Sequence, residues 1–421
     1  MTGSNAEELI ARAERAERTG RPAEAHNLWT LLLRDHPNHP RALFLQGRRR
    51  IEQGDAAAGL AMLSQAEAND RANPDIPLYA ALAHRNNGAL SEALAAIDRA
   101  LAIDPYFFMA QLSKGAMLEQ AGQKRLAART YSHALKIAPP ADRMPQAMKQ
   151  QFDRAQAAVS ENAEALAEHL RARTAALRAD AAGADLARFD ESLNVLAGVA
   201  KPYPQEPSLL NYTRLPATTF YDRAHFPWMN ALEAETATIL GELVRVMHED
   251  RHGFAPYIQK RAGEPVNQWG ELNHSPDWSS FFLWKDGVRD EANCARCPRT
   301  AAILDALPLA HQTGYGPTAM FSLLEPRTHI PAHTGSANIR LIAHLPLILP
   351  ANCRFRVGAD TREWRMGQSW VFDDTIEHEA WNDSDEVRVI LIFDVWNPHL
   401  SDVERTLVTE MMLALNEYNR A

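Results

Sequence analysis

Two histidines and one arginine in the C-terminal half of the chain have a spacing that suits metal chemistry. His333 and His378 lie 45 positions apart, each at the end of a strand-like run, and Arg388 follows ten positions after the second histidine. Ferrous iron in oxygenases is usually held by two imidazoles and one carboxylate on a single face, which leaves positions for a cosubstrate and O2. The sequence therefore predicts an open iron site with His333 and His378 as ligands.

The carboxylate of this common pattern stands two positions after the first histidine, where this chain has Gly335. Another protein group or water must then complete the site. The two glutamates on either side of the second histidine, Glu377 and Glu379, alternate to the opposite face of its strand, so we do not expect them to be ligands. We expect Asp373 or Asp374 to accept a hydrogen bond that orients the ring of the second histidine.

Arg388 lies within the apolar segment 387–390. A guanidinium buried there without a partner would be unfavourable, so the pattern indicates a bound anion. The planar fork of arginine suits a carboxylate, and 2-oxoglutarate is a dicarboxylate whose keto acid end chelates iron. The sequence therefore predicts 2-oxoglutarate as cosubstrate. The alternative is an arginine on the solvent face of an edge strand.

Short runs of β-branched and aromatic residues, separated by turn residues, follow position 318, and they cover residues 319–324, 340–349, 353–357, 369–372, 377–381 and 387–395. Many short strands without intervening helices predict a double-sheet jelly roll, also called a double-stranded β-helix or cupin fold. Flanking helices are expected at 228–249 and 401–420, because apolar residues recur there at helical spacing. The aromatic cluster at 266–284 is expected to be core, with Trp278 as the exception.

The N-terminal third carries an internal repeat of 34 residues. Glycines recur at that interval at positions 20, 54, 88 and 122, with small residues seven positions before and five after each one, and proline 17 positions after three of them. A 34-residue period of paired helices is the tetratricopeptide signature. We predict a multidomain α + β chain: a four-repeat α-solenoid at 6–139, a helical cap or linker at 140–202, and the jelly roll at 203–421.

Such solenoids present a concave surface, so we expect this arm to bind a protein or peptide, although a structural spacer is the alternative. The net charge of −9 and pI near 6.0 argue against a nucleic-acid partner. No apolar run approaches the roughly 18 residues of a membrane span, and the polar start of the chain does not resemble a signal peptide, so a cytoplasmic location is expected.

Cys294 and Cys297 form a single CxxC pair, expected to be incidental rather than redox-active or metal-binding.

Residues 203–400 resemble the aspartyl/asparaginyl β-hydroxylase family, and the matching motifs are Asp277-Trp278-Ser279 with Leu283-Trp284, Pro331-Ala332-His333-Thr334-Gly335, Arg340 with His344, Phe372-Asp373-Asp374 with Glu377-His378-Glu379 and Trp381, and Asp394-Val395-Trp396. The family's hallmark is a two-histidine iron site without the usual carboxylate. The resemblance implies that His333 and His378 bind Fe(II), that Ser322, His344 and Arg388 bind 2-oxoglutarate, and that Trp278 lines its pocket. Eukaryotic members also join tetratricopeptide-like repeats to this domain.

The chain departs from the family at three places. Members that act on aspartyl residues hold the substrate carboxylate with two arginines, and here the first is Arg340 but the second position is Ile342. Cys294 matches the first cysteine of the family's loop disulfide, whereas Ala301 stands at the second. We also expect no counterpart of the membrane anchor of the eukaryotic enzymes.

The resemblance implies a dioxygenase that hydroxylates a protein or peptide side chain, of the Asp/Asn β-carbon type, with the repeats recruiting the substrate. Two alternatives stay open. One is a hydroxylase of a small molecule or a lipid acyl chain, and the other is a catalytically idle cupin fused to a repeat-based adaptor.

Overall fold

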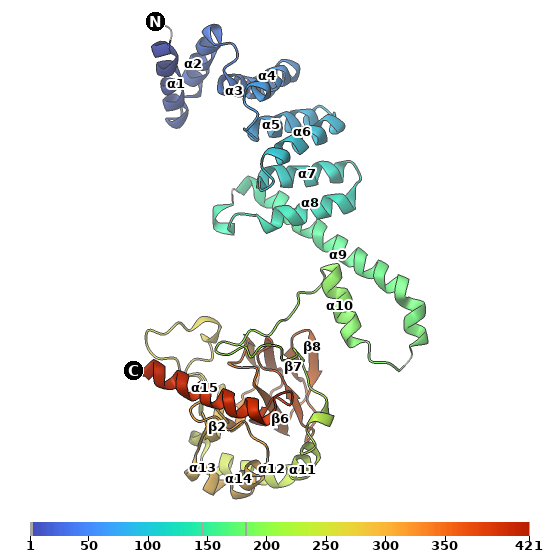
Figure 1. Ribbon diagram of the computed structural model, residues 1–421, viewed down its shortest axis with the longest axis vertical. Coiled ribbons are helices and arrows are strands. Elements are labelled where there is room, and N and C mark those ends of the chain that lie inside the picture. Colours follow the sequence, from blue (N-terminus) through green and yellow to red (C-terminus); the bar gives the residue numbers. More distant parts are fainter. Residues whose placement is uncertain (1–2, 145, 182, 421) are drawn as a thin grey trace. The chain divides into compact units, whose positions relative to one another are not determined.

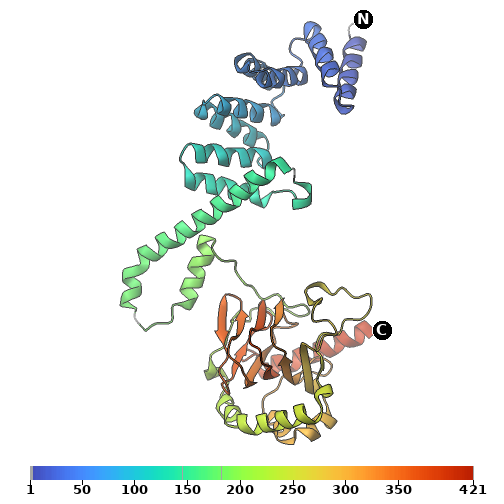
Figure 2. The same cartoon turned by 180° about the vertical axis from the view of Figure 1, so that it is seen from behind.

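The computed structural model describes residues 3–144, 146–181 and 183–420. The chain divides into two compact units, Met1–Ala200 and Lys201–Ala421, and Figures 1 and 2 show that the first is helical and the second is built around β-sheet. The division falls immediately before the proline-rich segment 201–207.

Helices of the first unit pair in chain order, as the 34-residue period predicts: α1 (Gly3–Arg18) with α2 (Pro22–Asp35), α3 (Pro40–Glu52) with α4 (Ala56–Asn69), α5 (Asp75–Asn86) with α6 (Leu90–Ile103), and α7 (Phe108–Gln120) with α8 (Lys124–Lys136). The glycine between the helices of each pair has a left-handed φ, from 67° at Gly20 to 89° at Gly54. Glycine adopts this conformation without the steric cost that a side chain would add. The tetratricopeptide-like solenoid is therefore confirmed.

The small residues of the repeat let paired helices approach closely. A Cβ added at Gly115 in α7 would lie 2.3 Å from the ring of Tyr131 in α8, and one added at Gly59 would lie 2.6 Å from the carbonyl oxygen of Gly47. These distances are far below van der Waals contact, so the two helices of a pair could not pack at this separation with larger residues.

One long helix, α9 (Gln146–Asp180), follows the repeats, and α10 (Ala187–Ala197) lies beside its C-terminal half, as Figures 1 and 2 show. The first half of α9 buries Ala155 and Ala158 against Leu112 and Tyr131 of the last repeat. It thereby covers the apolar face that the last repeat of a solenoid would otherwise expose.

The second unit contains two antiparallel sheets. The larger has the order β1-β2-β4-β11-β6-β9 with β3 beside β2, and the smaller has the order β5-β10-β7-β8. Their bounds are β1 (Ala255–Pro256), β2 (Trp278–Lys285), β3 (Val288–Arg289), β4 (Ala319–Leu324), β5 (Thr328–His333), β6 (Arg340–Ile348), β7 (Cys353–Val357), β8 (Asp360–Glu363), β9 (Trp370–Phe372), β10 (His378–Asn382) and β11 (Arg388–Trp396). Strands β4 to β11 supply four strands to each sheet, which confirms the jelly roll.

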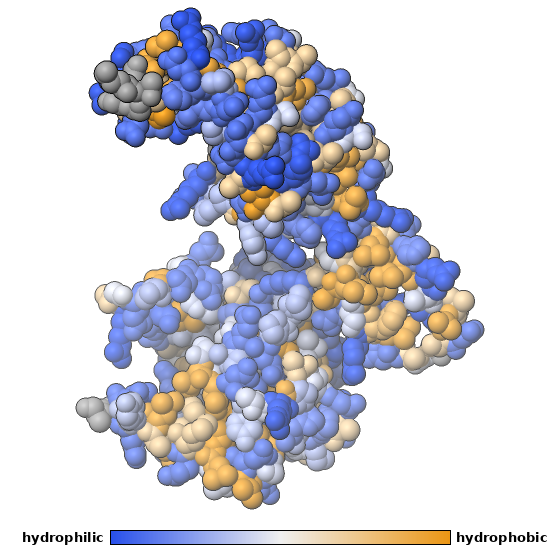
Figure 3. All heavy atoms as spheres, turned by 45° about the horizontal axis from the view of Figure 1, so that its top comes forward, coloured by the Kyte–Doolittle hydropathy of each residue, from blue (hydrophilic) through white to orange (hydrophobic). Residues whose placement is uncertain are grey.

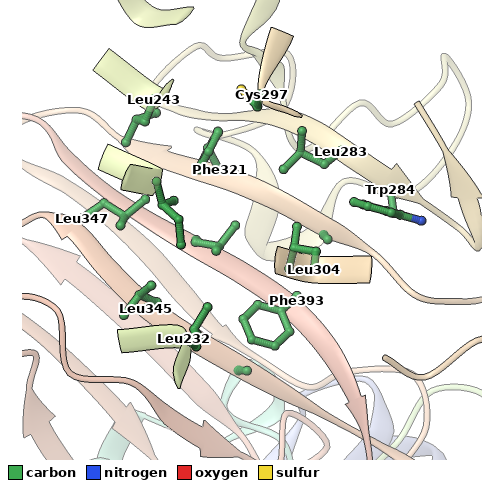
Figure 4. Packing of buried hydrophobic residues seen from close by; sticks show 14 of the residues in the cluster. Leu232, Leu243, Leu283, Trp284, Cys297, Leu304, Phe321, Leu345, Leu347 and Phe393 are labelled. Carbon is green, nitrogen blue, oxygen red and sulfur yellow. The ribbon is translucent and has the colours of Figure 1, made fainter. Parts of the chain in front are cut away.

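The larger sheet carries a different layer on each face. One face packs against α11 (Met229–Ala234), α12 (Thr236–Glu249), α13 (Glu291–Arg296) and α14 (Pro298–Asp305), and Figure 4 shows Leu232, Leu243 and Leu304 from these helices among Phe321, Leu345 and Phe393 from the strands. The other face points toward the smaller sheet. Alternation along β6 therefore sends Leu341 and Ala343 to the helices, and Arg340, Ile342 and His344 to the interior of the jelly roll.

The expectation for the flanking helix holds in part. The helix expected at 228–249 is broken at Glu235, because the hydroxyl of Thr236 donates to the Glu233 carbonyl at 2.6 Å and competes with the helical hydrogen bonds. The aromatic cluster at 266–284 is core, as expected: its second half is β2, which pairs with β4 and buries Trp278, Phe281 and Trp284.

The C-terminal helix α15 (Asp402–Arg420) buries Val408 and Met412, whereas the apolar series Val403, Leu407 and Met411 is exposed. Figure 3 shows apolar patches interrupting a mainly polar surface. Within the described residues, no helix combines the length and apolarity that a bilayer crossing requires.

The cysteines are buried and free. Burial raises the pKa of Cys294 to about 11 and that of Cys297 to about 12, so both stay protonated near neutral pH. A protonated, buried thiol is a poor nucleophile and a poor metal ligand, which agrees with the expectation that this CxxC pair is incidental.

Candidate metal and cosubstrate site

A cavity of about 340 Å³ lies between the two sheets of the jelly roll. The structure brings every site residue that the sequence predicts to its wall: Trp278, Ser322, His333, Arg340, His344, His378 and Arg388. They come from β2, β4, β5, β6, β10 and β11, so the cavity exists only once both sheets have formed.

His333 and His378 lie side by side on adjacent strands of the smaller sheet. They are direct partners in the register of β5 and β10, and their ring centroids are 4.0 Å apart. The Nδ1 atom of His333 lies 2.7 Å from the Pro331 carbonyl oxygen, and that of His378 lies 3.0 Å from the Ile376 carbonyl oxygen. Because a carbonyl can only accept, each Nδ1 must carry the proton, which leaves the Nε2 lone pair of each ring free to bind a metal.

Both rings are held in the neutral form. Burial lowers the pKa of His333 to about 4, and burial together with the neighbouring His333 lowers the pKa of His378 well below its ordinary value. Metal binding by imidazole requires the neutral ring, so this pair does not have to lose protons before binding at neutral pH.

The position of the usual third ligand is closed by another residue. A Cβ at Gly335 would lie 1.9 Å from Oδ2 of Asp374, so the Asp374 carboxyl group fills the space that a side chain at position 335 would need. Asp374 is 8% exposed, and its Oδ1 has no hydrogen-bond partner among the described residues. Burial raises its pKa to about 8, against the opposing effect of Arg340. This carboxyl group thus lines the cavity with a free oxygen.

The ring of His378 is not oriented by an aspartate, so that expectation is wrong. The backbone carbonyl of Ile376 takes this role, while Asp373 accepts hydrogen bonds from Thr375 and Gln205. A local turn in the backbone places the Ile376 carbonyl two residues before the histidine, and the type of side chain does not reveal this.

Glu377 and Glu379 point away from the cavity, as strand alternation predicts. Both accept hydrogen bonds from Arg356, at 2.9 Å and 2.5 Å, and Glu379 also contacts His329. Among the described residues, no group of three or more His, Cys, Asp or Glu side chains is close enough to hold a metal ion. The two histidines are therefore the protein donors that the chain offers here.

Arg388 stands on a central strand of the larger sheet, between β4 and β6, and is 2% exposed. It has no ion pair or hydrogen bond within the part of the chain that the structure describes, and its Nε is buried without a partner. The Trp364 ring lies 5.1 Å from its guanidinium carbon. Burial lowers the pKa of Arg388 to about 10. A buried, uncompensated cation of this kind is expensive unless an anion joins it.

Two polar side chains reach the cavity from the strands that flank β11. Ser322 of β4 accepts a hydrogen bond from Trp278 Nε1 at 3.1 Å, and His344 of β6 is buried with its Nδ1 unpartnered. Burial, with a contribution from Arg388, lowers the pKa of His344 well below its ordinary value. The three residues Ser322, His344 and Arg388 define what we call the cosubstrate end of the cavity.

Aromatic residues that the sequence reasoning missed form much of the wall. Trp269, at the end of the short 3₁₀ helix Asn267–Trp269, lies 4.9 Å from His333 between ring centroids, and Tyr257 lies 4.3 Å from Trp278. Trp364 follows β8 and covers Arg388. Their aromatic type gave a weak signal, because such residues are as common in cores as in binding sites.

Arg340 lines the cavity but is already engaged by the protein. Its Nη1 donates to Asp394 Oδ2 at 2.5 Å and to the Tyr315 carbonyl at 2.9 Å, and its Nη2 donates to Ser336 Oγ at 2.9 Å. The sequence-based hypothesis made Arg340 a substrate ligand, and it did not foresee this internal partner.

A jelly roll whose cavity holds two neighbouring histidines and a buried arginine is a candidate metal-dependent enzyme. Residues 233–398 match the family model described as Aspartyl/Asparaginyl beta-hydroxylase, so this part of the second unit is similar to that family.

Curated proteins show the same similarity. The Homo sapiens "Aspartyl/asparaginyl beta-hydroxylase" is 33% identical over 180 residues, which cover 42% of this chain and 24% of that protein. The Rhizobium tropici "Ornithine lipid ester-linked acyl 2-hydroxylase" is 35% identical over 192 residues, which cover 45% of this chain and 64% of that protein. This chain thus spans less than two thirds of either relative.

Among solved structures, that titled "Crystal structure of MamA protein" aligns with 47% of this chain and 94% of its own, at 16% identity and a TM-score of 0.32.

Proposed function

We propose that the second unit is an Fe(II)- and 2-oxoglutarate-dependent dioxygenase that hydroxylates an unactivated carbon. One observation carries this proposal: Arg388 is buried without a counter-ion among the described residues, in the same cavity in which His333 and His378 each keep a free Nε2. A carboxylate would compensate that cation, and two neutral imidazoles suit ferrous iron.

The donor set fits iron with water as the remaining ligand. Two imidazoles on one side leave the other coordination positions open for the cosubstrate, O2 and water. Asp374 would offer its free Oδ1 to hydrogen bonds inside the cavity, while its Oδ2 occupies the space above Gly335. Hydrogen bonds of this kind orient the ligands of a metal and tune its affinity.

The cosubstrate end fits the far carboxylate of 2-oxoglutarate. Arg388 offers a forked pair of N–H donors, and the unpartnered Nδ1 of His344 and the hydroxyl of Ser322 lie on adjacent strands. Charge-assisted bonds in such a dry pocket are stronger than bonds between neutral groups.

When bound, iron and 2-oxoglutarate would supply the oxidising power to place one oxygen atom of O2 into a C–H bond and the other into succinate, with release of CO2. The chain's own residues position the reactants and keep water out. Trp269, Trp278 and Tyr257 wall the cavity near His333, and Trp364 covers Arg388. Such a wall protects a reactive centre from side reactions with solvent.

Turnover of 2-oxoglutarate to succinate by the purified chain, with Fe(II) and ascorbate, tests the proposal. We expect His378→Ala and Arg388→Met to abolish it. His329→Ala is the matched control, because His329 lies on the same strand as His333 but faces outward against Glu379 and Trp381. Succinate formation that persists in His378→Ala would refute the ligand assignment.

We propose further that the repeat unit recruits a protein or peptide substrate. A groove lined by residues of α1 to α3 contains Trp29, Arg48 and Arg49, and the Nε atoms of both arginines lack partners within the described residues. Arg48→Glu with Arg49→Glu should reduce hydroxylation of a true protein substrate while basal 2-oxoglutarate turnover stays unchanged. Loss of both activities, or of neither, contradicts this role.

The alternative of a small-molecule or lipid acyl hydroxylase uses the same chemistry and draws support from the similarity to the Rhizobium tropici protein. The alternative of an idle cupin is disfavoured by Arg388, because a domain without an anionic ligand would keep a costly unpaired cation in its core.

A further inference from the structure

The cavity has a second end, which lies opposite the cosubstrate end. Arg340 and His344 are four residues apart on β6, which corresponds to about 13 Å along a strand. Strand β11 runs antiparallel to β6, so Arg388 lies near the far end of β6, whereas Trp396 is the register partner of Arg340. We call the region around Arg340, Ser336, Ile342 and Asp374 the substrate end.

The positive charge at the substrate end is already compensated. Burial opposes the charge of Arg340, but the carboxylates of Asp394 and Asp374 hold its pKa above the ordinary value. Asp394 is 2% exposed and also accepts a hydrogen bond from the Thr318 backbone N–H at 2.8 Å, so it cannot turn away to release the guanidinium. A substrate carboxylate that displaced Asp394 would leave that carboxylate buried without its partner.

The remaining positions at this end offer no replacement cation. Ile342 lies between Arg340 and His344 on the cavity face of β6 and presents a hydrocarbon side chain. Apart from the histidines, the charged side chains that the structure places on the cavity wall are Arg340, Asp374 and Arg388. Since Arg388 belongs to the cosubstrate end, the substrate end carries a compensated arginine, an additional carboxyl group and an apolar surface.

We propose that the substrate end selects an uncharged group and rejects a carboxylate, with Ile342 as the residue that determines this specificity. The group is an aliphatic or carboxamide carbon chain, and it comes from a neutral peptide side chain or from an acyl chain. Arg340 keeps N–H donors that its internal partners do not use, and these can serve a neutral acceptor such as a carbonyl oxygen. The proposal rests on the iron and 2-oxoglutarate function proposed above.

Paramagnetic broadening of ligand NMR signals by Mn(II) tests this without turnover. The full chain is loaded with Mn(II) and 2-oxoglutarate. Tryptophan fluorescence measures the binding of 2-oxoglutarate, and the same measurement on Arg388→Met shows whether that binding depends on Arg388. Four probes are then added: the N-acetyl methylamides of aspartate, asparagine and leucine, and hexanamide. Aspartate and asparagine are nearly isosteric and differ in charge, while the leucine derivative and hexanamide separate a peptide from an acyl source.

In the wild-type chain we expect the signals of the asparagine probe to be broadened at least about tenfold more strongly than those of the aspartate probe, because a site without a counter-charge discriminates strongly against an ion. Either the leucine probe or hexanamide should be broadened to the same extent as the asparagine probe. Ile342→Arg should reverse the order of aspartate and asparagine, and Ile342→Leu should not. Asp394→Asn releases Arg340 without altering Ile342, so it should raise the broadening of aspartate by a second route.

Equal broadening of aspartate and asparagine, or stronger broadening of aspartate in the wild-type chain, overturns the selectivity and leaves the iron and 2-oxoglutarate function standing. Failure of Ile342→Arg and Asp394→Asn to favour aspartate, with 2-oxoglutarate still binding, overturns the roles of these residues. Absence of any Arg388-dependent binding of 2-oxoglutarate overturns both proposals.

Discussion

Replacing Arg388 with methionine should make the ligand-free second unit more stable while removing its response to 2-oxoglutarate. The pKa of Arg388 falls to about 10 through burial, and at about 1.4 kcal/mol for each pKa unit the buried charge costs about 3 kcal/mol. Methionine keeps most of the apolar volume and loses the contact with Trp364, which is worth about 1 kcal/mol. We therefore expect the free energy of unfolding to rise by about 2 kcal/mol without ligand.

The wild-type chain should respond in the opposite way to its cosubstrate. At 2-oxoglutarate concentrations 100 times the Kd, with Mn(II) present, binding should raise its free energy of unfolding by about 2.7 kcal/mol, and Arg388→Met should lose this gain. Urea unfolding followed by tryptophan fluorescence measures both effects, because eight of the nine tryptophans lie in the second unit.

Arg354→Met is the matched control. Arg354 lies on β7, is about half exposed and forms a surface ion pair with Asp383, so its loss should change stability by less than about 1 kcal/mol. A ligand-free Arg388→Met chain that is less stable than wild type, or that still gains stability from 2-oxoglutarate, would show that Arg388 is not an unpaired cation awaiting a carboxylate.

Three further substitutions test separate parts of the structure. Gly335→Ala should weaken Mn(II) binding at least tenfold in a calorimetric titration, because its Cβ would collide with Asp374. The double variant Gly335→Ala with Asp374→Ala should recover part of the lost Mn(II) affinity, and no recovery would contradict the collision. Gly115→Ala should destabilise the repeat unit by about 1–3 kcal/mol through its collision with Tyr131, which thermal circular dichroism measures; an unchanged melting temperature would contradict the close approach of α7 and α8. Burial raises the pKa of Glu233, but hydrogen bonds from an arginine and a serine outweigh burial and lower the pKa below 4.5, so the stabilising effect of Glu233 is present above that pH and is lost as the pH falls through the lower, folded-state pKa. In urea titrations the difference in unfolding free energy between wild type and Glu233→Gln should therefore shrink on acidification. A difference that grows on acidification would contradict the lowered pKa.

The sequence predicted those parts of the fold that follow from local periodicity. The 34-residue spacing of glycines predicted the helix pairs, because each glycine occupies a left-handed turn that other residues avoid. The expected strand 377–381 placed His378 at a strand position, whereas none of the expected strands after residue 318 covers β5, which ends at His333. The apolar context of Arg388 indicated its burial. The roles of these residues stay predictions, although the structure gathers them in one cavity.

Contacts that depend on register between distant strands could not be read from the chain. Arg340 and Asp394 are 54 positions apart, and their ion pair follows from the pairing of β6 with β11. The Asp374 carboxyl group over Gly335 likewise arises from the meeting of two loops. Trp364 was missed because its neighbours in sequence gave no sign that it covers Arg388.

The central claim, that two imidazoles hold iron beside a dicarboxylate fixed by Arg388, is tested most directly by anaerobic absorption spectroscopy. Fe(II) chelated by the keto acid of 2-oxoglutarate gives a visible metal-to-ligand charge-transfer band. We predict that the band appears in the wild-type chain at one iron per chain, disappears in His378→Ala, and needs much higher 2-oxoglutarate in Arg388→Met. A band of unchanged intensity in His378→Ala, or no band in the wild-type chain, would contradict this account.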